Sequence, residues 1–274
     1  MIDRPAELSI ILSQAVDLDP AALHGSLGVF TDIDDTLTAD GRIDPPAAAA
    51  LADLRAAGVP VIAITGRPLG WCLPLLGAWP LDAMVAENGG AALIPDGDGA
   101  RVEFAQPAAE RARNAERLRA AAARVLHEVP GATLARDSDG RVTDIAVDHS
   151  EFARLDEAQI ETVVCLMRDE GLTATVSSIH VNGWIGVHTK LSAAHWMLRR
   201  LYGRELAPEI DRWVYVGDST NDQLMFGAFE RSVGVANLRR FAARLHTWPR
   251  WITRGERGAG FAEVAQAVIA GFGR

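Results

Sequence analysis

Three carboxylates, those of Asp32, Asp34 and Asp35, stand within four positions of the sequence, directly after an apolar run. Like charges this close repel one another, so such a cluster is usually held by a cation or by chemistry that needs it. In an extended chain Asp32 and Asp34 project to the same side. The alternative is that these acids cap a helix or a turn, as Asp35 can. The cluster is therefore a candidate site that still lacks its cation.

A second candidate follows the next apolar run, in the sequence Thr65-Gly66-Arg67-Pro68. A hydroxyl followed by glycine at a strand-to-helix turn offers an oxygen and bare backbone amides to an anion. An ordinary threonine N-cap explains the same letters. The segment is thus a candidate phosphate loop.

Two further acids, Asp218 and Asp222, stand four residues apart in GDSTND at the start of an expected helix. They provide oxygen ligands of the kind that magnesium takes. As a helix-capping sequence the same residues would be unremarkable.

Lys190 is the only lysine in a chain with 27 basic residues, the others being arginine. A chain that uses arginine for generic positive charge has kept this ammonium either by chance or for chemistry that a guanidinium cannot perform. Because Lys190 opens an expected helix, it could place its ammonium beside the carboxylates.

The elements that must position these residues alternate along the chain. Apolar or β-branched runs predict strands at 27–33, 59–65, 82–88, 211–218 and 232–236. Helices are predicted at 45–58, at 69–79, from Lys190, after Thr220 and at 262–272. This alternation predicts an α/β fold with a doubly wound, Rossmann-like parallel sheet and ligands at the carboxyl ends of its strands.

From about Gly90 the pattern changes to a helix followed by two strands, and this order occurs twice. The helices are expected at 107–128 and 155–170, and the strands at 132–137, 141–148, 173–178 and 179–187. We expect an inserted α/β domain at 90–185, a core of 26–89 and 186–274, and an N-terminal helical appendage at 1–25.

Taken in order, DxDxT, T-G-R, K and GDxxND resemble the motifs of the haloacid dehalogenase (HAD) superfamily of phosphohydrolases. The insert and the phrases 85–90 (VAENGG) and 232–237 (SVGVAN) resemble the branch with a large α/β cap, which includes Cof-type, sucrose-phosphate and phosphomannomutase-like proteins. Many Cof-type members carry glycine where Asp35 stands. The resemblance covers the chain from about Gly28 onward.

The resemblance implies a role for each matching residue. Asp32 would be the nucleophile that forms an aspartyl-phosphate, and Asp34 the general acid/base whose backbone carbonyl also binds the metal. Thr65 and Lys190 would bind phosphate, and Gly66 and Arg67 would complete the substrate loop. Asp218 and Asp222, with Asp32 and Asp34, would hold Mg²⁺.

Substrate choice is expected in the inserted domain. Within 179–187, His180, Asn182 and Trp184 alternate with apolar residues, so one polar face could stack on a sugar ring and bond its hydroxyls. The alternative is a solvated outer face of a small sheet.

Net charge and the length of the apolar runs limit the kinds of partner that the protein is expected to bind. A net charge of −9 disfavours nucleic acid and anionic membranes, and no apolar run is long enough to span a bilayer. The N-terminus lacks the basic-then-apolar order of a secretory signal, so we expect a cytoplasmic protein. Cys72 and Cys165 are expected to be buried free thiols.

The sequence therefore predicts a Mg²⁺-dependent phosphomonoesterase that acts on a small phosphorylated metabolite, with a sugar phosphate preferred. Two alternatives stay open: a sugar phosphomutase that uses the same aspartyl-phosphate, and a non-catalytic sugar-phosphate-binding protein.

Overall fold

The computed structural model describes residues 16–273, which form two compact units. Unit 1 comprises residues 16–64, Trp79–Ala83 and 190–273. Unit 2 comprises Thr65–Ala78 and Met84–Thr189. Residues 1–15 of the expected N-terminal appendage lie outside the described residues, and the predicted domain boundaries stay predictions.

Unit 1 is built on parallel strands that are buried along most of their length. In spatial order these are β14 (Trp251–Ile252), β13 (Arg231–Gly234), β12 (Trp213–Gly217), β1 (Gly28–Thr31) and β4 (Val61–Ile64). Every neighbouring pair is parallel. Because β1 lies between β4 and β12, the acids that follow β1 and β12 emerge at one edge of the unit. The parallel α/β core that the alternating pattern predicts is confirmed.

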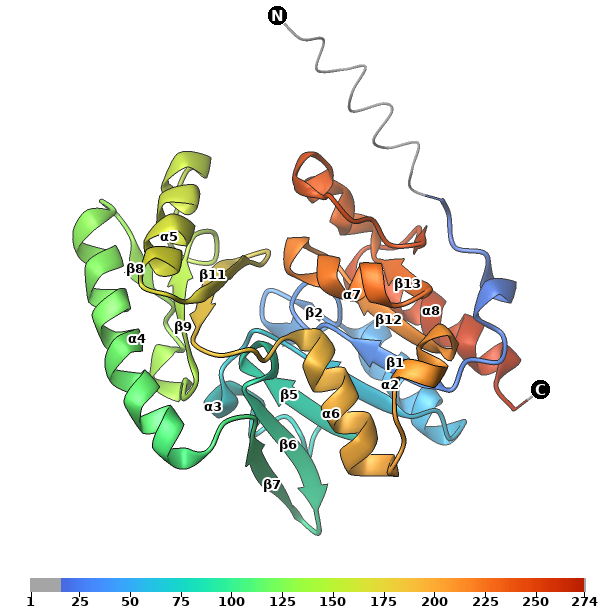
Figure 1. Ribbon diagram of the computed structural model, residues 1–274. Coiled ribbons are helices and arrows are strands. Elements are labelled where there is room, and N and C mark those ends of the chain that lie inside the picture. The colour runs from blue at the N-terminus through green and yellow to red at the C-terminus, as the bar shows by residue number, and fades with distance from the viewer. Residues whose placement is uncertain (1–15, 274) are drawn as a thin grey trace, which may run out of the picture. The chain divides into compact units, whose positions relative to one another are not determined.

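Helices of unit 1 cover these strands, with α6 in front of them and α2 and α8 behind in the view of Figure 1. The α-helices are α2 (Pro45–Ala56), α6 (Lys190–Tyr202), α7 (Gln223–Ala228) and α8 (Arg257–Gly271). Short 3₁₀ segments are η1 (Pro20–Leu23), η4 (Ala207–Arg212), η5 (Thr220–Asp222) and η6 (Ala236–Arg244), and β2 (Thr38–Ala39) pairs with β3 (Arg42–Ile43). Helix α2 begins with two prolines. The first turn of a helix has no intrahelical acceptor for its N–H groups, so proline, which lacks an N–H, loses no hydrogen bond there.

Unit 2 contains an antiparallel hairpin that the sequence analysis did not predict. Strand β5 (Ala83–Ala86) leads through η2 (Glu87–Gly89) into β6 (Ala91–Asp96), which pairs with both β5 and β7 (Gly99–Phe104). The turn between β6 and β7 contains Gly97 at φ 56°, a conformation that glycine adopts freely. Helix α3 (Leu69–Cys72) is also shorter than the predicted 69–79.

The remainder of unit 2 is a small antiparallel sheet covered by two helices. Its strand order is β10 (Thr173–Val176), β11 (His180–Trp184), β9 (Asp144–Asp148) and β8 (Thr133–Leu134). The helices are α4 (Ala108–Glu128) and α5 (Glu157–Asp169), and η3 (Ser138–Gly140) lies between β8 and β9. The two predicted helix-strand-strand repeats are therefore present in this unit, with shorter strands.

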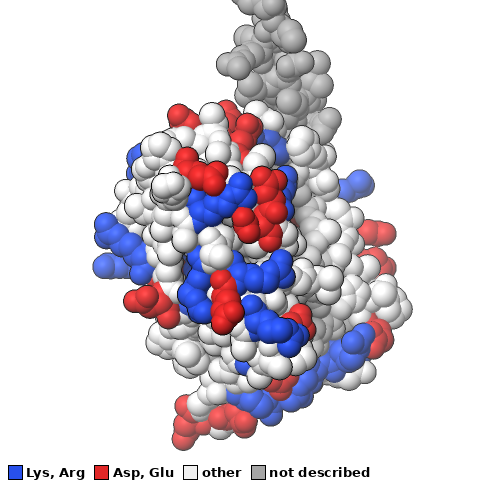
Figure 2. Space-filling model, turned by 60° about the vertical axis from the view of Figure 1, so that its left-hand side comes forward, with Lys and Arg blue, Asp and Glu red and all other residues white. Residues whose placement is uncertain are grey.

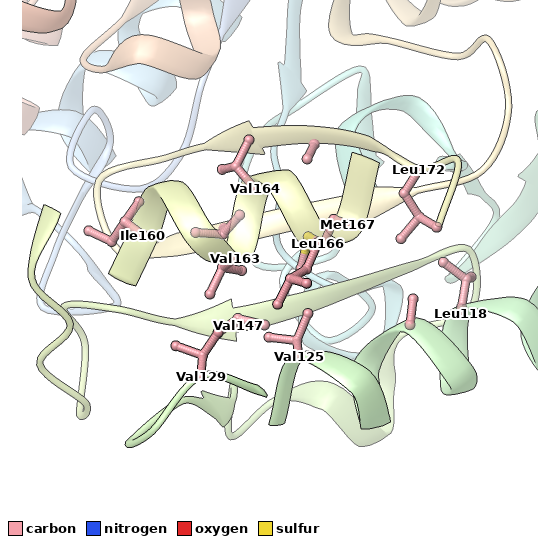
Figure 3. Packing of buried hydrophobic residues seen from close by; sticks show 13 residues of the cluster. Leu118, Val125, Val129, Val147, Ile160, Val163, Val164, Leu166, Met167 and Leu172 are labelled. Carbon is pink, nitrogen blue, oxygen red and sulfur yellow. The ribbon is translucent and has the colours of Figure 1, made fainter. Parts of the chain in front are cut away.

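Apolar side chains of α4 and α5 meet those of the small sheet in a single cluster (Figure 3). Val125 of α4, Val163 and Met167 of α5, and Val147 of β9 are fully buried there. Gly183 of β11 allows the close approach of α5, because a methyl group at this position would lie 2.7 Å from the Met167 sulfur. The cluster gives the unit a hydrophobic core of its own.

The surface face in Figure 2 mixes both signs of charge. On α4 and α5, Arg124 pairs with Glu128 and Glu170 at 2.8 Å each. Within residues 16–273, none of the helices has the length and apolar character needed to cross a bilayer. Cytoplasmic location stays a prediction.

Neither Cys72 nor Cys165 forms a disulfide within residues 16–273, as predicted, and Cys72 is buried. The expected burial of Cys165 is wrong, because this residue lies on the exposed face of α5.

Candidate active site

Asp32 lies at the carboxyl end of β1, among the parallel strands of unit 1. Its amide donates to the Val216 carbonyl of β12 at 2.8 Å, which carries the pairing of the two strands one residue past the end of β1. The backbone of Asp32 is thereby fixed, and the residue is only 4% exposed. Asp34 follows in the next turn, partly buried and near enough to act electrostatically on Asp32.

Lys190, the first residue of α6, reaches two of the predicted acids. Its Nζ donates to Asp32 Oδ1 at 2.5 Å and to Asp222 Oδ1 at 2.8 Å. All three side chains are almost entirely shielded from solvent. The structure therefore brings together an ammonium and two carboxylates whose positions in the sequence are far apart.

Asp222 is fully occupied by partners of this chain. Besides Lys190, its Oδ1 accepts from the Tyr215 hydroxyl at 2.5 Å. Its Oδ2 accepts from the backbone amides of Asp218 and Ser219 at 3.0 and 3.1 Å. This arrangement orients Lys190 and closes the turn of GDSTND, and it leaves Asp222 fewer free lone pairs for a metal than Asp218 has.

Asp218 has an oxygen that suits a cation. Its Oδ1 is buried and accepts no hydrogen bond from residues 16–273, while Oδ2 lies 3.4 Å from the Asn237 amide nitrogen. One oxygen each of Asp32, Asp218 and Asp222 lie within 4.8 Å of one another. A buried, unpartnered carboxylate oxygen is costly without a positive partner, so this donor set fits a hard divalent ion such as Mg²⁺.

Burial and mutual repulsion dominate the electrostatics of these acids. Desolvation raises the pKa of Asp32 to about 7, with Lys190 acting in the opposite direction and Asp222 and Asp34 adding to the rise. The pKa of Asp218 is raised well above its usual range by burial and then by Asp32 and Asp222. Burial lowers the pKa of Lys190, but its two carboxylate partners outweigh burial and raise it. The acids of the site thus outnumber Lys190, the cation that contacts them.

Asp35 turns away from this group toward α8. Its carboxylate Oδ1 lies 2.9 Å from Arg257 Nε, in an ion pair without hydrogen-bond geometry. Its carbonyl accepts from Asn237 at 2.9 Å, and Asn237 in turn accepts from the Arg257 amide at 2.9 Å. Asp35 has φ 54°, which explains why glycine suits this position in the Cof-type pattern.

Thr65, Gly66 and Arg67 open unit 2 in a turn directly after β4. The hydroxyl of Thr65 accepts from the Arg67 amide at 3.0 Å, and the Thr65 carbonyl accepts from the Asn88 amide at 2.9 Å. Asn88 thus ties the turn to the segment that follows β5.

The Gly66 carbonyl is held by two side chains from the small sheet and the loop before it. Arg141 Nη1 donates to it at 3.0 Å, and Asn182 Nδ2 at 3.3 Å. Both donors also bind Asp144, which Arg141 contacts at 2.9 Å through each carboxylate oxygen. Burial raises the pKa of Asp144 to about 7 even though Arg141 opposes the rise.

His180 and Arg67 meet at a shared acid. Glu151 accepts from Arg67 at 3.1 Å and lies 2.9 Å from His180 Nε2. Burial raises the pKa of Glu151, but the hydrogen bond from His180 and the charge of Arg67 outweigh burial and bring this pKa to about 2. Arg67 also contacts Asp137 at 3.1 Å. The predicted substrate residues Arg67 and His180 therefore belong to one charged network.

Trp184 is placed differently from its two predicted companions. It is 2% exposed, and its indole nitrogen donates to the His188 carbonyl at 2.9 Å. Its ring stacks on that of His188 at a centroid distance of 5.8 Å. Its role in ring stacking with a substrate stays a prediction, and no part of the function proposed below depends on it.

Sequence reasoning missed Tyr215 and Arg141, and it quoted Glu87 without a role. Tyr215 carried a signal, because it is a hydroxyl residue in an otherwise apolar strand two positions before Gly217. Glu87 is fully buried and accepts from the amides of Leu69 and Thr143 at 3.0 and 2.5 Å. No local pattern could have identified Arg141 among the many arginines of the chain.

Residues 29–112 match the haloacid dehalogenase-like hydrolase family. No curated protein sequence matches the chain.

Several solved structures share the fold. A Thermoplasma acidophilum protein aligns with a TM-score of 0.68 at 18% identity, covering 88% of this chain and 96% of that one. The sucrose-phosphatase of Synechocystis sp. PCC6803, determined with sucrose and phosphate, gives 0.63 at 17% identity, with 88% and 98% covered. The C-terminal domain of the C. albicans trehalose-6-phosphate phosphatase gives 0.65 at 14% identity, with 93% and 99% covered.

Fold and site together describe an α/β core with acids placed at the ends of parallel strands. The chain is similar to the haloacid dehalogenase-like hydrolases over residues 29–112, and it shares its fold with solved structures that include phosphatases. The predicted resemblance is confirmed over these residues, and the matched family is one of hydrolases, which agrees with the prediction of an enzyme.

Proposed function

We propose that the protein is a Mg²⁺-dependent phosphomonoesterase that acts through an aspartyl-phosphate. The observation that carries the proposal is the buried contact of Lys190 with Asp32, next to the unpartnered Oδ1 of Asp218. A carboxylate that attacks a phosphate dianion must overcome charge repulsion, and a fixed ammonium beside the nucleophile lowers that barrier.

In the first step, an oxygen of the Asp32 carboxylate attacks phosphorus and the ester P–O bond breaks. Asp34 donates its proton to the departing alkoxide oxygen. Lys190 keeps Asp32 oriented and stabilises the charge on the transferring group, because its own position is fixed by Asp222. This nucleophilic step replaces one difficult hydrolysis by two easier reactions.

In the second step, water attacks the phosphorus of the aspartyl-phosphate and gives a proton to Asp34. The bond from phosphorus to the Asp32 oxygen breaks, which releases phosphate and restores the carboxylate. Proton transfer by one positioned group in both directions contributes roughly 10²- to 10⁴-fold to the rate.

Asp32 and Asp218 would hold Mg²⁺, with the backbone carbonyl of Asp34 as a further ligand. The bound ion would neutralise charge on the phosphoryl oxygens and orient them toward the nucleophile. Asp222 would contribute indirectly, because it orients Lys190 and accepts from the Asp218 amide in the turn that carries Asp218.

Thr65, Gly66 and Arg67 would bind the phosphoryl group. Their turn follows β4, the neighbour of β1, and ligands of open α/β sheets bind at the carboxyl ends of such strands. Arg141 and Asn182 support this role, because both donate to the Gly66 carbonyl and fix the loop. Both residues lie in the part of unit 2 that we expect to select the substrate.

A sugar phosphate is the favoured substrate class. Unit 2 carries the partly exposed acids Asp137 and Glu151, whose carboxylates can accept hydrogen bonds from sugar hydroxyls. Two of the proteins that share the fold are named as sugar-phosphate phosphatases, for sucrose phosphate and for trehalose-6-phosphate.

The charge balance of unit 2 favours a monoesterase over a phosphomutase that uses a sugar bisphosphate. Arg67 pairs with Asp137 and Glu151, and Arg141 pairs with Asp137 and Asp144. A second phosphate would have to compete with these carboxylates for the same guanidinium groups.

The test is release of inorganic phosphate from a panel of sugar, nucleotide and vitamin phosphates, with Mg²⁺ and with EDTA. We expect Mg²⁺-dependent release from at least one sugar phosphate, loss of turnover in Asp32→Asn, and full activity in Asp169→Asn, a matched exposed acid on α5. Acid quenching at short times should trap phosphorylated protein for the wild type and for Asp169→Asn, and none for Asp32→Asn. Dependence on a bisphosphate with little free phosphate would establish the mutase, and binding without turnover would establish the non-catalytic alternative.

A further inference from the structure

Asn88 combines burial, a left-handed backbone and a side-chain amide without an acceptor in the described part of the chain. It is 2% exposed, its backbone has φ 53° and ψ 25°, and its side-chain Nδ2 donates no hydrogen bond to residues 16–273. A buried amide donor without an acceptor is unfavourable, so an acceptor from outside the chain is expected.

The neighbouring Glu87 shows what a satisfied residue of this turn looks like. Glu87 has the same φ of 53°, yet its carboxylate accepts from the amides of Leu69, Val142 and Thr143. These bonds over-determine the conformation of Glu87. By contrast, the side-chain Nδ2 of Asn88 makes no hydrogen bond to residues 16–273 that would hold the backbone of Asn88 in its left-handed conformation.

Asn88 is also fixed against the candidate phosphate loop. Its amide donates to the Thr65 carbonyl at 2.9 Å, and the Glu87 amide donates to the Arg67 carbonyl at 3.0 Å. A methyl group on Gly66 would lie 3.3 Å from Asn88 Nδ2 and 3.2 Å from Asn182 Oδ1. The unpartnered donor therefore lies directly beside the α-carbon of Gly66.

We propose that Asn88 is an oxyanion-binding residue of the Thr65–Arg67 loop and that its side-chain amide donates to a phosphoryl oxygen of the ligand. This inference rests on the proposed function, to which it adds a binding residue on the segment after β5. Gly66 would serve the same end, because any side chain at that position would crowd the Asn88 amide.

The backbone conformation allows a clean test. Asn88→Gly removes the amide while keeping a residue that adopts positive φ without strain. Asn88→Asp keeps the shape and the tolerance for this conformation, but replaces the donor by an acceptor that repels phosphate. Asn114→Ala is the matched control, since Asn114 is a buried asparagine of the same unit whose amide already donates to Gln106 at 3.2 Å.

Calorimetric titration with inorganic phosphate in the presence of Mg²⁺ gives the readout. We expect Kd to rise about 10- to 100-fold in Asn88→Gly, the effect of losing a hydrogen bond to a charged group, and more in Asn88→Asp. Asn114→Ala should bind phosphate like the wild type. A wild-type Kd in Asn88→Gly would overturn the proposal, because asparagine would then serve only the left-handed turn.

A second measurement does not depend on the variants folding. In the wild-type protein, the assigned side-chain NH₂ resonances of Asn88 should shift on addition of phosphate and those of Asn114 should not. Unmoved Asn88 resonances at saturating phosphate, or no phosphate binding by the wild type, would overturn the proposal. Phosphate binding without hydrolysis of any phosphomonoester would instead contradict the proposed function and leave the assignment of Asn88 standing.

Discussion

The ammonium of Lys190 lies 2.5 Å from Oδ1 of Asp32, although 158 positions of sequence separate the two residues. The contact is buried on both sides. An unpaired carboxylate would be strongly disfavoured at this depth, and the only lysine of the chain opposes the rise that burial causes in the pKa of Asp32.

Replacing Lys190 by arginine should abolish most of the activity. The planar guanidinium is larger than the ammonium and cannot occupy the point between Asp32 and Asp222 with the same geometry. We expect kcat to fall by at least about 10²-fold, the cost of losing one preorganised charge-stabilising donor. Steady-state phosphate release measures the loss. A Lys190→Arg enzyme as fast as wild type would contradict the role of the ammonium.

Asp218 and Asp222 should respond differently to the same substitution. Asp218→Asn should weaken Mg²⁺ binding at least about 10-fold and should not destabilise the metal-free protein, because it removes one of several repelling carboxylates. Asp222→Asn should lower the free energy of unfolding by about 3 kcal/mol, because Lys190 and Tyr215 lose a buried partner. Titration calorimetry and urea unfolding separate the two effects. Equal loss of Mg²⁺ affinity without loss of stability in Asp222→Asn would make Asp222 a direct ligand.

Asp35 should tolerate glycine better than alanine. At φ 54° alanine pays a steric cost that glycine does not, and both variants lose the ion pair with Arg257. We therefore expect Asp35→Ala to be less stable than Asp35→Gly by about 1 kcal/mol in urea unfolding. The reverse order would mean that this turn relaxes on substitution.

Arg141→Lys should loosen the candidate phosphate loop. Lysine keeps the charge beside Asp144, but it lacks the planar fork with which Arg141 donates to Asp144 and the Gly66 carbonyl through Nη1 and to Asp137 through Nη2. We expect a loss of about 1–3 kcal/mol in the free energy of unfolding and a higher KM for the phosphorylated substrate. Arg124→Lys, at a partly exposed ion pair on α4, is the control and should change neither quantity measurably.

His188 should make the stability of the protein depend on pH. Burial lowers the pKa of His188 from its usual 6.5 to about 4 in the folded state. Between these values the unfolded chain binds a proton that the folded chain does not, so stability is retained above pH 6.5 and lost as the pH falls toward 4. His188→Gln should flatten the fall of the urea midpoint over this range, whereas His127→Gln, on the exposed side of α4, should not. An unchanged slope in His188→Gln would show that other groups carry the acid sensitivity.

The sequence predicted the parallel core well because its strands are short, apolar and bounded by turn residues. The runs around β1, β4 and β12 match the structure to within one or two residues. The sequence analysis did not predict the hairpin of β6 and β7. Residues 91–104 lie between a predicted strand and a predicted long helix, where the alternation of strands and helices ends. The pairing of β6 with β5 joins residues from Ala86↔Ala91 to Met84↔Leu93, and the choice of a strand's partner is not encoded by strand propensity.

By itself, the sequence determined the kinds of chemical group present and the strand ends that carry them. Asp32, Asp218 and Lys190 could be named because acids after apolar runs, and a lone lysine among arginines, are visible in one dimension. Only the tertiary structure decided which groups are already satisfied. Asp222 has four donors, Asp218 keeps an open oxygen and Asn88 an open amide, because partnership depends on burial and on contacts between residues far apart in the chain.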